Sequence, residues 1–307
     1  MLVNLLSIAV VAVAASCFPS VEAACHPAVI KNLVVFGDSV SDIGNAYKLT
    51  KHQWPLSKKK YYRGRFSNGP IWVDDVGKKK GYKVSDQAYG GATTDSKLVQ
   101  GYTGRNSDVP VPGFTQQIKN YVKSKPKSIP ETLFVINFQG NDYFFNSTLP
   151  PSEVVGKIRK GIDRLVDLGA KQILVVQNLN MGIIPYFSDK PAYAKAYTEI
   201  AAQQQVLLKQ LADRLHYEFG TPPEHPFRIN CKVRKVNFGF INLWDVFAEL
   251  YKPDQLARLG IKDVVHGCVS SDYNTVCKNP DELFYWDDFH PSRKIHKEIA
   301  KAIEKIL

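Results

Sequence analysis

The feature that most constrains the fold is a repeated alternation of short apolar runs with amphipathic helical segments. The apolar runs predict buried strands at 32–36, 132–138, 171–178 and 236–243, with a weaker strand at 82–89. Between and after them the spacing of apolar residues predicts helices at 70–80, 113–124, 152–168, 192–216 and 292–307. Strands that alternate with helices in this way predict an α/β fold with a parallel sheet covered on both faces.

In such folds ligands bind beyond the carboxyl ends of the strands. Three strand ends carry the small and polar residues that a site needs: Gly37-Asp38-Ser39, Gly90-Gly91 and Gly140-Asn141-Asp142. The chain contains no internal repeat, low-complexity tract or linker. We therefore expect one domain with its site at these three turns.

The first residues predict a secreted protein. An apolar run from Leu5 to Ala15 is followed by Pro19 and by the small-residue pattern Val21-Glu22-Ala23. This arrangement is typical of a secretory signal peptide, and the run is shorter than the ~20 residues that span a bilayer. We expect residues 1–23 to be the signal peptide, residues 24–307 to be the single domain, and the protein to be extracellular, with no transmembrane segment.

Secretion bears on the cysteines and on one asparagine. Four cysteines remain after the signal peptide, and an even number in an oxidising compartment predicts disulfides. Of the three pairings, we favour Cys268 with Cys277, which closes a short loop, and this leaves Cys25 with Cys231. No CxxC or HxxxH spacing supports a metal site. Asn146-Ser147-Thr148 is a glycosylation sequon that a secreted protein can use.

A serine, a histidine and an aspartate form the candidate catalytic set. Ser39 lies on a predicted strand-to-helix turn, where its hydroxyl can be presented above the sheet, and it needs a base to act as a nucleophile. His290 precedes the last helix, and Asp287 three residues upstream can reach its Nδ1 and orient the ring. Asp288 is the rival for that role.

An ester-cleaving serine also needs donors for the oxyanion of the tetrahedral intermediate. The Ser39 amide, a glycine amide at Gly90 or Gly91 and the Asn141 side chain are the candidates. Asp38 and Asp42 are expected to bond the backbone of the turn instead. The remaining histidines (His26, His52, His216, His225, His266 and His296) are expected on the surface or in loops, and residues 203–205, all Gln, on a solvated helix face.

The motifs resemble the GDSL (SGNH) esterase and lipase superfamily from about residue 32 to 307. Residues 36–45 (FGDSVSDIGN) closely resemble its first block, and residues 88–93 (AYGGAT) resemble its glycine block. Gly140-Asn141-Asp142 matches the G-x-N-D block with the spacer residue absent, and Asp287 with His290 matches the last block. Residues 65–73 (RFSNGPIWV) are similar to plant and fungal members.

The resemblance implies a three-layer α/β/α, flavodoxin-like fold with a five-stranded, mainly parallel sheet. It implies ester hydrolysis through an acyl-enzyme on Ser39, with His290 as general base and acid and Asp287 orienting it. It also favours Gly91 over Gly90 as the oxyanion donor and requires no metal or cofactor. Lipid acyl esters and acetylated carbohydrates remain alternative substrates, and acyl transfer or a catalytically silent binding protein are alternative functions.

The formal net charge of +11 does not decide the function. No nucleic-acid-binding motif accompanies it, so we expect no nucleic-acid partner. We also expect the enzyme to be a monomer. Part of the charge lies in residues 58–65 (KKKYYRGR), between the first two motif blocks. If this cluster borders the site, it predicts peripheral contact with anionic surfaces. The aromatic residues Trp54, Tyr61, Tyr62, Tyr143 and Phe144 near the catalytic loops fit either substrate contacts or internal packing.

Overall fold

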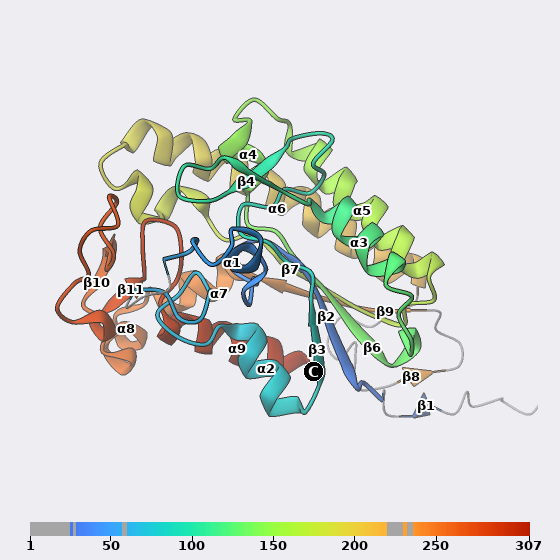
Figure 1. Ribbon diagram of the computed structural model, residues 1–307. Coiled ribbons are helices and arrows are strands. Elements are labelled where there is room, and N and C mark those ends of the chain that lie inside the picture. Colours follow the sequence, from blue (N-terminus) through green and yellow to red (C-terminus); the bar gives the residue numbers. More distant parts are fainter. Residues whose placement is uncertain (1–24, 27–28, 57–59, 220–229, 232–235) are drawn as a thin grey trace, which may run out of the picture.

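A parallel five-stranded sheet forms the centre of the computed structural model, which describes residues 25–26, 29–56, 60–219, 230–231 and 236–307 (Figure 1). Its strand order is β3-β2-β6-β7-β9. The strands are β2 (Asn32–Gly37), β3 (Lys83–Asp86), β6 (Thr132–Asn137), β7 (Gln172–Gln177) and β9 (Asn237–Asn242). Counted along the chain this is the order 2-1-3-4-5 of flavodoxin-like folds, so the predicted fold is confirmed.

Helices cover both faces of the sheet (Figure 1). One face carries α3 (Phe114–Lys123), α5 (Pro151–Asp167) and α6 (Pro191–Phe219). The other carries α2 (Trp72–Lys80), α7 (Leu243–Leu250) and α9 (Arg293–Ile306), and α8 (Pro253–Leu259) packs against α7. Because both faces are covered, every residue of β6 and β7 is buried, which explains why these strands are continuous apolar runs in the sequence.

Smaller elements, which the sequence did not predict, surround the carboxyl ends of the strands. They include α1 (Asn45–Leu49), α4 (Asn141–Phe145), the hairpin β4 (Gly101–Thr103) with β5 (Val109–Val111), and β10 (Asp263–Gly267) with β11 (Leu283–Tyr285). The 3-10 helices are η2 (Met181–Ile183), η3 (Pro185–Phe187) and η4 (Pro280–Glu282), together with η1 (Ile129–Glu131), which directly precedes β6 at the amino end of the sheet. Each is too short to show a hydrophobic period of its own. Among the described residues, no helix is long and apolar enough to cross a membrane.

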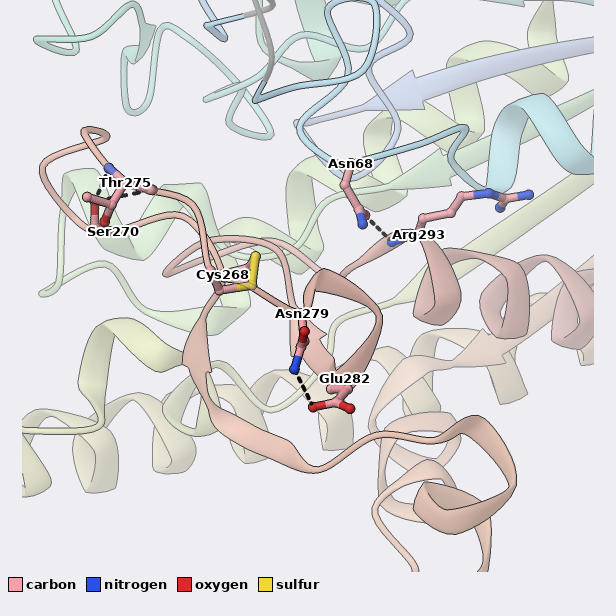
Figure 2. The surroundings of a disulfide bond; sticks show 8 residues. Asn68, Cys268, Ser270, Thr275, Asn279, Glu282 and Arg293 are labelled. Atoms are coloured by element: carbon pink, nitrogen blue, oxygen red, sulfur yellow. Dashed lines mark hydrogen bonds between the residues drawn. A yellow bond between two sulfur atoms is a disulfide. The ribbon is translucent and has the colours of Figure 1, made fainter.

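A disulfide joins Cys268 to Cys277 (Figure 2). It closes the loop that carries Tyr273, and the Cys277 amide also donates to the Cys268 carbonyl at 2.7 Å. The backbones of Cys25 and Cys231 pair in register between β1 (Cys25–His26) and β8 (Asn230–Cys231). The side chains of these two residues, and the predicted signal peptide at 1–23, lie outside the described residues, so both stay predictions.

Two expectations about polar residues were wrong. Gln204 is buried, and its carbonyl accepts a 2.5 Å hydrogen bond from the Tyr143 hydroxyl; its neighbour Gln205 donates to the Asn178 carbonyl. Gln204 and Gln205 therefore pack against α4 and the end of β7, whereas Gln203 is exposed as expected. His296 of α9 is also buried, and burial lowers its pKa to about 3. His225 lies outside the described residues.

Candidate active site

Ser39 and Asn141 lie on either side of the point where the strand order reverses. Ser39 follows β2, from which the chain runs outward to β3; it returns to the other side of β2 as β6, which Asn141 follows. The turns after β2 and β6 therefore separate there and leave room for a ligand at the carboxyl edge. Figure 1 shows α1 and α4, which follow these two turns, beyond that edge.

A buried carboxylate ties the two turns together. Asp38 accepts hydrogen bonds from the Val40 amide at 3.1 Å and from the Gln139 amide, after β6, at 2.6 Å. Burial raises the pKa of Asp38 to about 6, although these backbone bonds oppose the shift. The turn that presents Ser39 is thus fixed to the strand next to it.

A second carboxylate joins the Ser39 loop to the glycine block. Asp42 accepts from the amides of Gly44, Asn45 and Ala46 at 2.6–3.0 Å, which caps α1, and from the Gly90 amide at 2.8 Å. The expectation that Asp38 and Asp42 bond backbone agrees with these contacts. They place residues 90–91 beside the Ser39 turn.

His290 and Asp287 form a hydrogen-bonded pair. The His290 Nδ1 atom lies 2.7 and 2.8 Å from the two carboxylate oxygens of Asp287. Asp287 also accepts from the amides of Phe289 and His290, both at 2.8 Å. Burial acts to raise the pKa of Asp287, but the charge of His290 and these bonds together lower it. Asp288 does not contact the ring; its carbonyl accepts from the Tyr186 amide at 2.9 Å.

Tyr61 supports this pair from behind, a role that the sequence did not reveal. Its hydroxyl donates to Asp287 Oδ2 at 2.7 Å, and its side chain is buried. Burial and the negative charge of Asp287 raise the pKa of Tyr61, which keeps the phenol protonated as a donor. The ring of Phe66 lies 5.0 Å from that of His290. No local signal links residue 61 to residue 287, because only the tertiary fold brings them together.

The candidate oxyanion donors are held by their own contacts. Gly91 has a φ of +84°, and a Cβ there would lie 1.9 Å from the Tyr102 carbonyl oxygen, so only glycine fits. Asn141 Nδ2 donates to the Ala92 carbonyl at 3.0 Å. An amide nitrogen carries two N–H groups, so this bond orients the side chain and leaves one donor for a ligand. Asp142, bonded to Thr94 at 2.6–3.1 Å, holds α4 against the glycine block.

One cavity of about 350 Å³ brings the predicted residues together. Ser39, Gly91, Asn141 and His290 all line it, and Asp287 lies behind His290. The rest of the wall is mostly apolar: Val40, Trp54, Phe66, Tyr102, Phe144, Phe145, Leu179, Met181, Ile184, Tyr186, Tyr273 and Phe289. Trp54 and Phe144 thus face the ligand space, whereas Tyr61 and Tyr143 are buried in the protein.

The basic cluster is not part of this wall. Of its described residues, 60–65, none lines the cavity; Lys60 bonds the Tyr273 carbonyl and Arg65 forms an ion pair with Asp74. Among the described residues that line the cavity, Arg105, beyond β4, is the one arginine or lysine. Among the described residues, no group of three or more His, Cys, Asp or Glu side chains could hold a metal ion.

A family model described as GDSL-like Lipase/Acylhydrolase matches residues 33–303. This chain belongs to that family. It is 23% identical over 291 residues to the thermolabile hemolysin of Vibrio parahaemolyticus, which covers 92% of this chain and 65% of that protein. It is 26% identical over 266 residues to the phosphatidylcholine-sterol acyltransferase of Aeromonas hydrophila, covering 83% and 70%.

The solved structures support the fold. A member of the lipolytic protein G-D-S-L family from Veillonella parvula matches with a TM-score of 0.50 and 10% identity, covering 90% of this chain and 98% of that chain. The predicted family and its ester-hydrolysing class are therefore confirmed. The plant or fungal subtype stays a prediction. The curated relatives extend beyond the matched region, so substrate and partners belong to the proposals below.

Proposed function

We propose that this protein is a serine esterase that cleaves carboxylic esters through an acyl-enzyme on Ser39. The observation that carries the proposal is the His290–Asp287 pair, with Nδ1 2.7 Å from the carboxylate, at the wall of the cavity that Ser39 also lines. Nucleophile, base, orienting acid and oxyanion donors are the full set that acyl transfer to serine needs.

In the first half-reaction His290 Nε2 takes the proton of the Ser39 hydroxyl as Oγ attacks the ester carbonyl. The negative charge that develops on the carbonyl oxygen is stabilised by the amides of Ser39 and Gly91 and by Asn141 Nδ2. His290 then gives its proton to the leaving alcohol, and the acyl group stays on Ser39. Asp287 stabilises the imidazolium. In the neutral ring it keeps the proton on Nδ1, so that Nε2 is the nitrogen that accepts the Ser39 proton.

In the second half-reaction water replaces the alcohol. His290 takes a proton from water, the hydroxide attacks the acyl-enzyme, and the same donors stabilise the second oxyanion. The proton on His290 returns to Ser39 Oγ as the acid leaves. Tyr61 adds a donor to Asp287 throughout, which supports its ionised form.

Active-site labelling tests this proposal. A fluorophosphonate should modify Ser39 of the folded protein, and Ser39→Ala should abolish both labelling and hydrolysis of nitrophenyl acetate. Ser41→Ala is the matched control, because Ser41 is buried two residues away and does not line the cavity. Undiminished hydrolysis by Ser39→Ala would contradict the assignment of the nucleophile. A wild-type protein that takes no label would favour the silent binding protein.

Acyl transfer is the second candidate, because one relative is a phosphatidylcholine-sterol acyltransferase. The acyl-enzyme would be the same, and a sterol or another alcohol would replace water. Product analysis with an ester donor and an added alcohol decides between them. A new ester as the main product would identify a transferase.

We also propose that the protein is secreted. The Cys268–Cys277 disulfide suits an oxidising compartment. Asn146 is exposed just after α4, as a glycosylated asparagine must be. Its Oδ1 accepts from the Thr148 hydroxyl at 2.8 Å, so the sequon is compactly turned. A shift in mass on glycosidase treatment, absent in Asn146→Gln, tests the glycan, and amino-terminal sequencing tests cleavage after Ala23.

A further inference from the structure

Three large apolar side chains are exposed close together at the mouth of the cavity. Ile183 of η2 and Tyr186 of η3 are each 38% exposed, and Tyr193, in the first turn of α6, is 62% exposed. We call these three residues the apolar rim. Both 3-10 helices pack against the helix that carries Tyr193, so the three residues come from elements in mutual contact. β10, which carries the exposed Val265, packs against η3 and extends it.

One rim residue, Tyr186, rests on an aromatic base. Tyr186 stacks on Phe289 with ring centroids 4.7 Å apart, and Phe289 is the neighbour of His290. Phe144 in turn lies 5.7 Å from Phe289 and 5.1 Å from Tyr197. The exposed edge of Tyr186 is therefore held in place before any partner binds, and a partner does not have to order it.

The rim is continuous with the apolar part of the cavity. Ile184, next to Ile183, and Met181, at the start of η2, line the cavity together with Leu179. Tyr186 belongs to both surfaces. The rim and the apolar part of the cavity wall therefore meet at Tyr186, and an apolar chain lying on the rim can extend along that wall.

A positively charged side chain lies against the rim. Lys190 lies over the Tyr186 ring, with Nζ 4.4 Å from the centroid. Asp189 pairs with Lys190, so the local charge is modest. Aromatic rings with lysines beside them are typical of surfaces that lie at the boundary between lipid headgroups and acyl chains.

We propose that the apolar rim docks this protein on the surface of a lipid bilayer, so that the acyl chain of a lipid ester enters the cavity from that surface. This inference rests on the proposed esterase function for its substrate, a lipid acyl ester. A polysaccharide fits less well, because the aliphatic Ile183 and the aliphatic wall behind it offer no hydrogen bonds to sugar hydroxyls. The net charge of +11 favours bilayers that carry anionic lipids.

Vesicle binding tests the docking separately from catalysis. The full chain carrying Ser39→Ala is mixed with vesicles of phosphatidylcholine, with or without phosphatidylserine, and the bound fraction is measured by sedimentation. Ile183→Asn with Tyr193→Ser removes apolar area from the rim at two residues that do not line the cavity. Val206→Asn with Tyr217→Ser is the matched control, since these residues are 58% and 90% exposed further along α6.

We expect the rim variant to bind vesicles at least about 10-fold more weakly, because less apolar surface is transferred from water to the bilayer on binding. The control variant should bind as the parent does, and phosphatidylserine should strengthen binding of both. In the Ser39-containing chain, the rim variant should keep its rate on soluble nitrophenyl acetate and lose rate on vesicle lipid.

Several results would overturn the docking surface. One is equal vesicle binding by rim and control variants, and another is no binding by the parent. If only the rim variant lost retention on acetylated xylan, the rim would be a polysaccharide-binding surface instead. A change in its sedimentation coefficient alone would assign it to self-association. Failure of the esterase proposal is distinct: Ser39 would then take no fluorophosphonate, whatever the vesicles show.

Discussion

Three buried aspartates near Ser39 have different electrostatic surroundings, and these distinguish their roles. Burial raises the pKa values of Asp38 and Asp142 to about 6, and the hydrogen bonds from neutral backbone and hydroxyl donors only partly oppose this shift. Asp287 is equally buried, yet its pKa is lowered, because His290 and Tyr61 add to the bonds that stabilise its charge. The aspartate beside the histidine is therefore the one held ionised, as an orienting acid must be.

Replacing Asn141 with Ala should lower kcat on nitrophenyl acetate by roughly 10²–10³, because one preorganised oxyanion donor is lost. The exposed Asn146→Ala, which lies outside the cavity wall, should keep the parent rate. Steady-state kinetics measure both, and thermal unfolding checks that each variant folds. A parental kcat in Asn141→Ala would rule out its role as a donor.

Tyr61→Phe should alter the pH profile as well as the stability. Without its donor the Asp287 carboxylate is less stabilised, so it holds the proton on His290 more tightly and the acid limb of the kcat/KM profile moves to higher pH. Losing a bond to a buried charge should also cost about 1.5–3 kcal/mol of unfolding free energy. Tyr62→Phe, which leaves the pair untouched, should do neither. An unshifted acid limb in Tyr61→Phe would reduce this residue to packing.

Short elements at the carboxyl edge, rather than the sheet itself, give the cavity its shape. The hairpin of β4 and β5 supplies Tyr102, the disulfide loop supplies Tyr273, and η2 supplies Met181. Close contacts fix them: the Tyr102 carbonyl lies against Gly91, and Met181 lies against Gly140. A change at these glycines is therefore transmitted to a whole wall.

Gly91→Ala tests this close packing, with Gly81→Ala as its control. Both glycines have positive φ, +84° and +68°, so both variants carry the cost of a left-handed alanine, about 1–2 kcal/mol. A Cβ at Gly81 meets nothing within 4 Å, whereas one at Gly91 meets the Tyr102 backbone. Gly91→Ala should therefore destabilise the protein more in chemical unfolding and also lower kcat. Equal effects of the two variants would contradict the packing argument.

For the whole molecule, buried titrating groups make stability depend on pH in two directions. Asp38 and Asp142 have folded pKa values of about 6, above the unfolded value of 3.8, so the folded state binds their protons first and gains stability as pH falls below 6. His296 has a folded pKa of about 3, below the unfolded 6.5, so it loses stability over the same range. Two aspartates against one histidine leave a net gain.

Thermal unfolding should therefore show a Tm that rises between pH 7 and about 5 and falls below about 4. The fall is expected because Asp95, Glu298 and other paired carboxylates with lowered pKa values become protonated there. Asp142→Asn should flatten the rise, and a Tm that falls steadily from pH 7 to 5 would contradict the balance.

The sequence by itself determined the sheet and its coverage. Long apolar runs mark β2, β6, β7 and β9 because these strands are mostly buried, and a helical period marks α6 because one of its faces is buried. Motif residues at the strand ends indicated Ser39 and Asn141 for a local reason, because a turn after a strand has few ways to present a side chain, and His290 was indicated by its place before the last helix. Asp287 could be predicted to orient His290 because the two residues are only three positions apart.

Only the tertiary structure decided what surrounds those residues. Tyr61 reaches Asp287 across 226 positions, and Gln204 bonds Tyr143 across 61. The apolar rim combines two 3-10 helices with the start of α6. Such contacts join segments whose separate patterns carry no trace of each other. Periodicity reports the face that an element buries, whereas the partner it meets depends on how the whole chain packs.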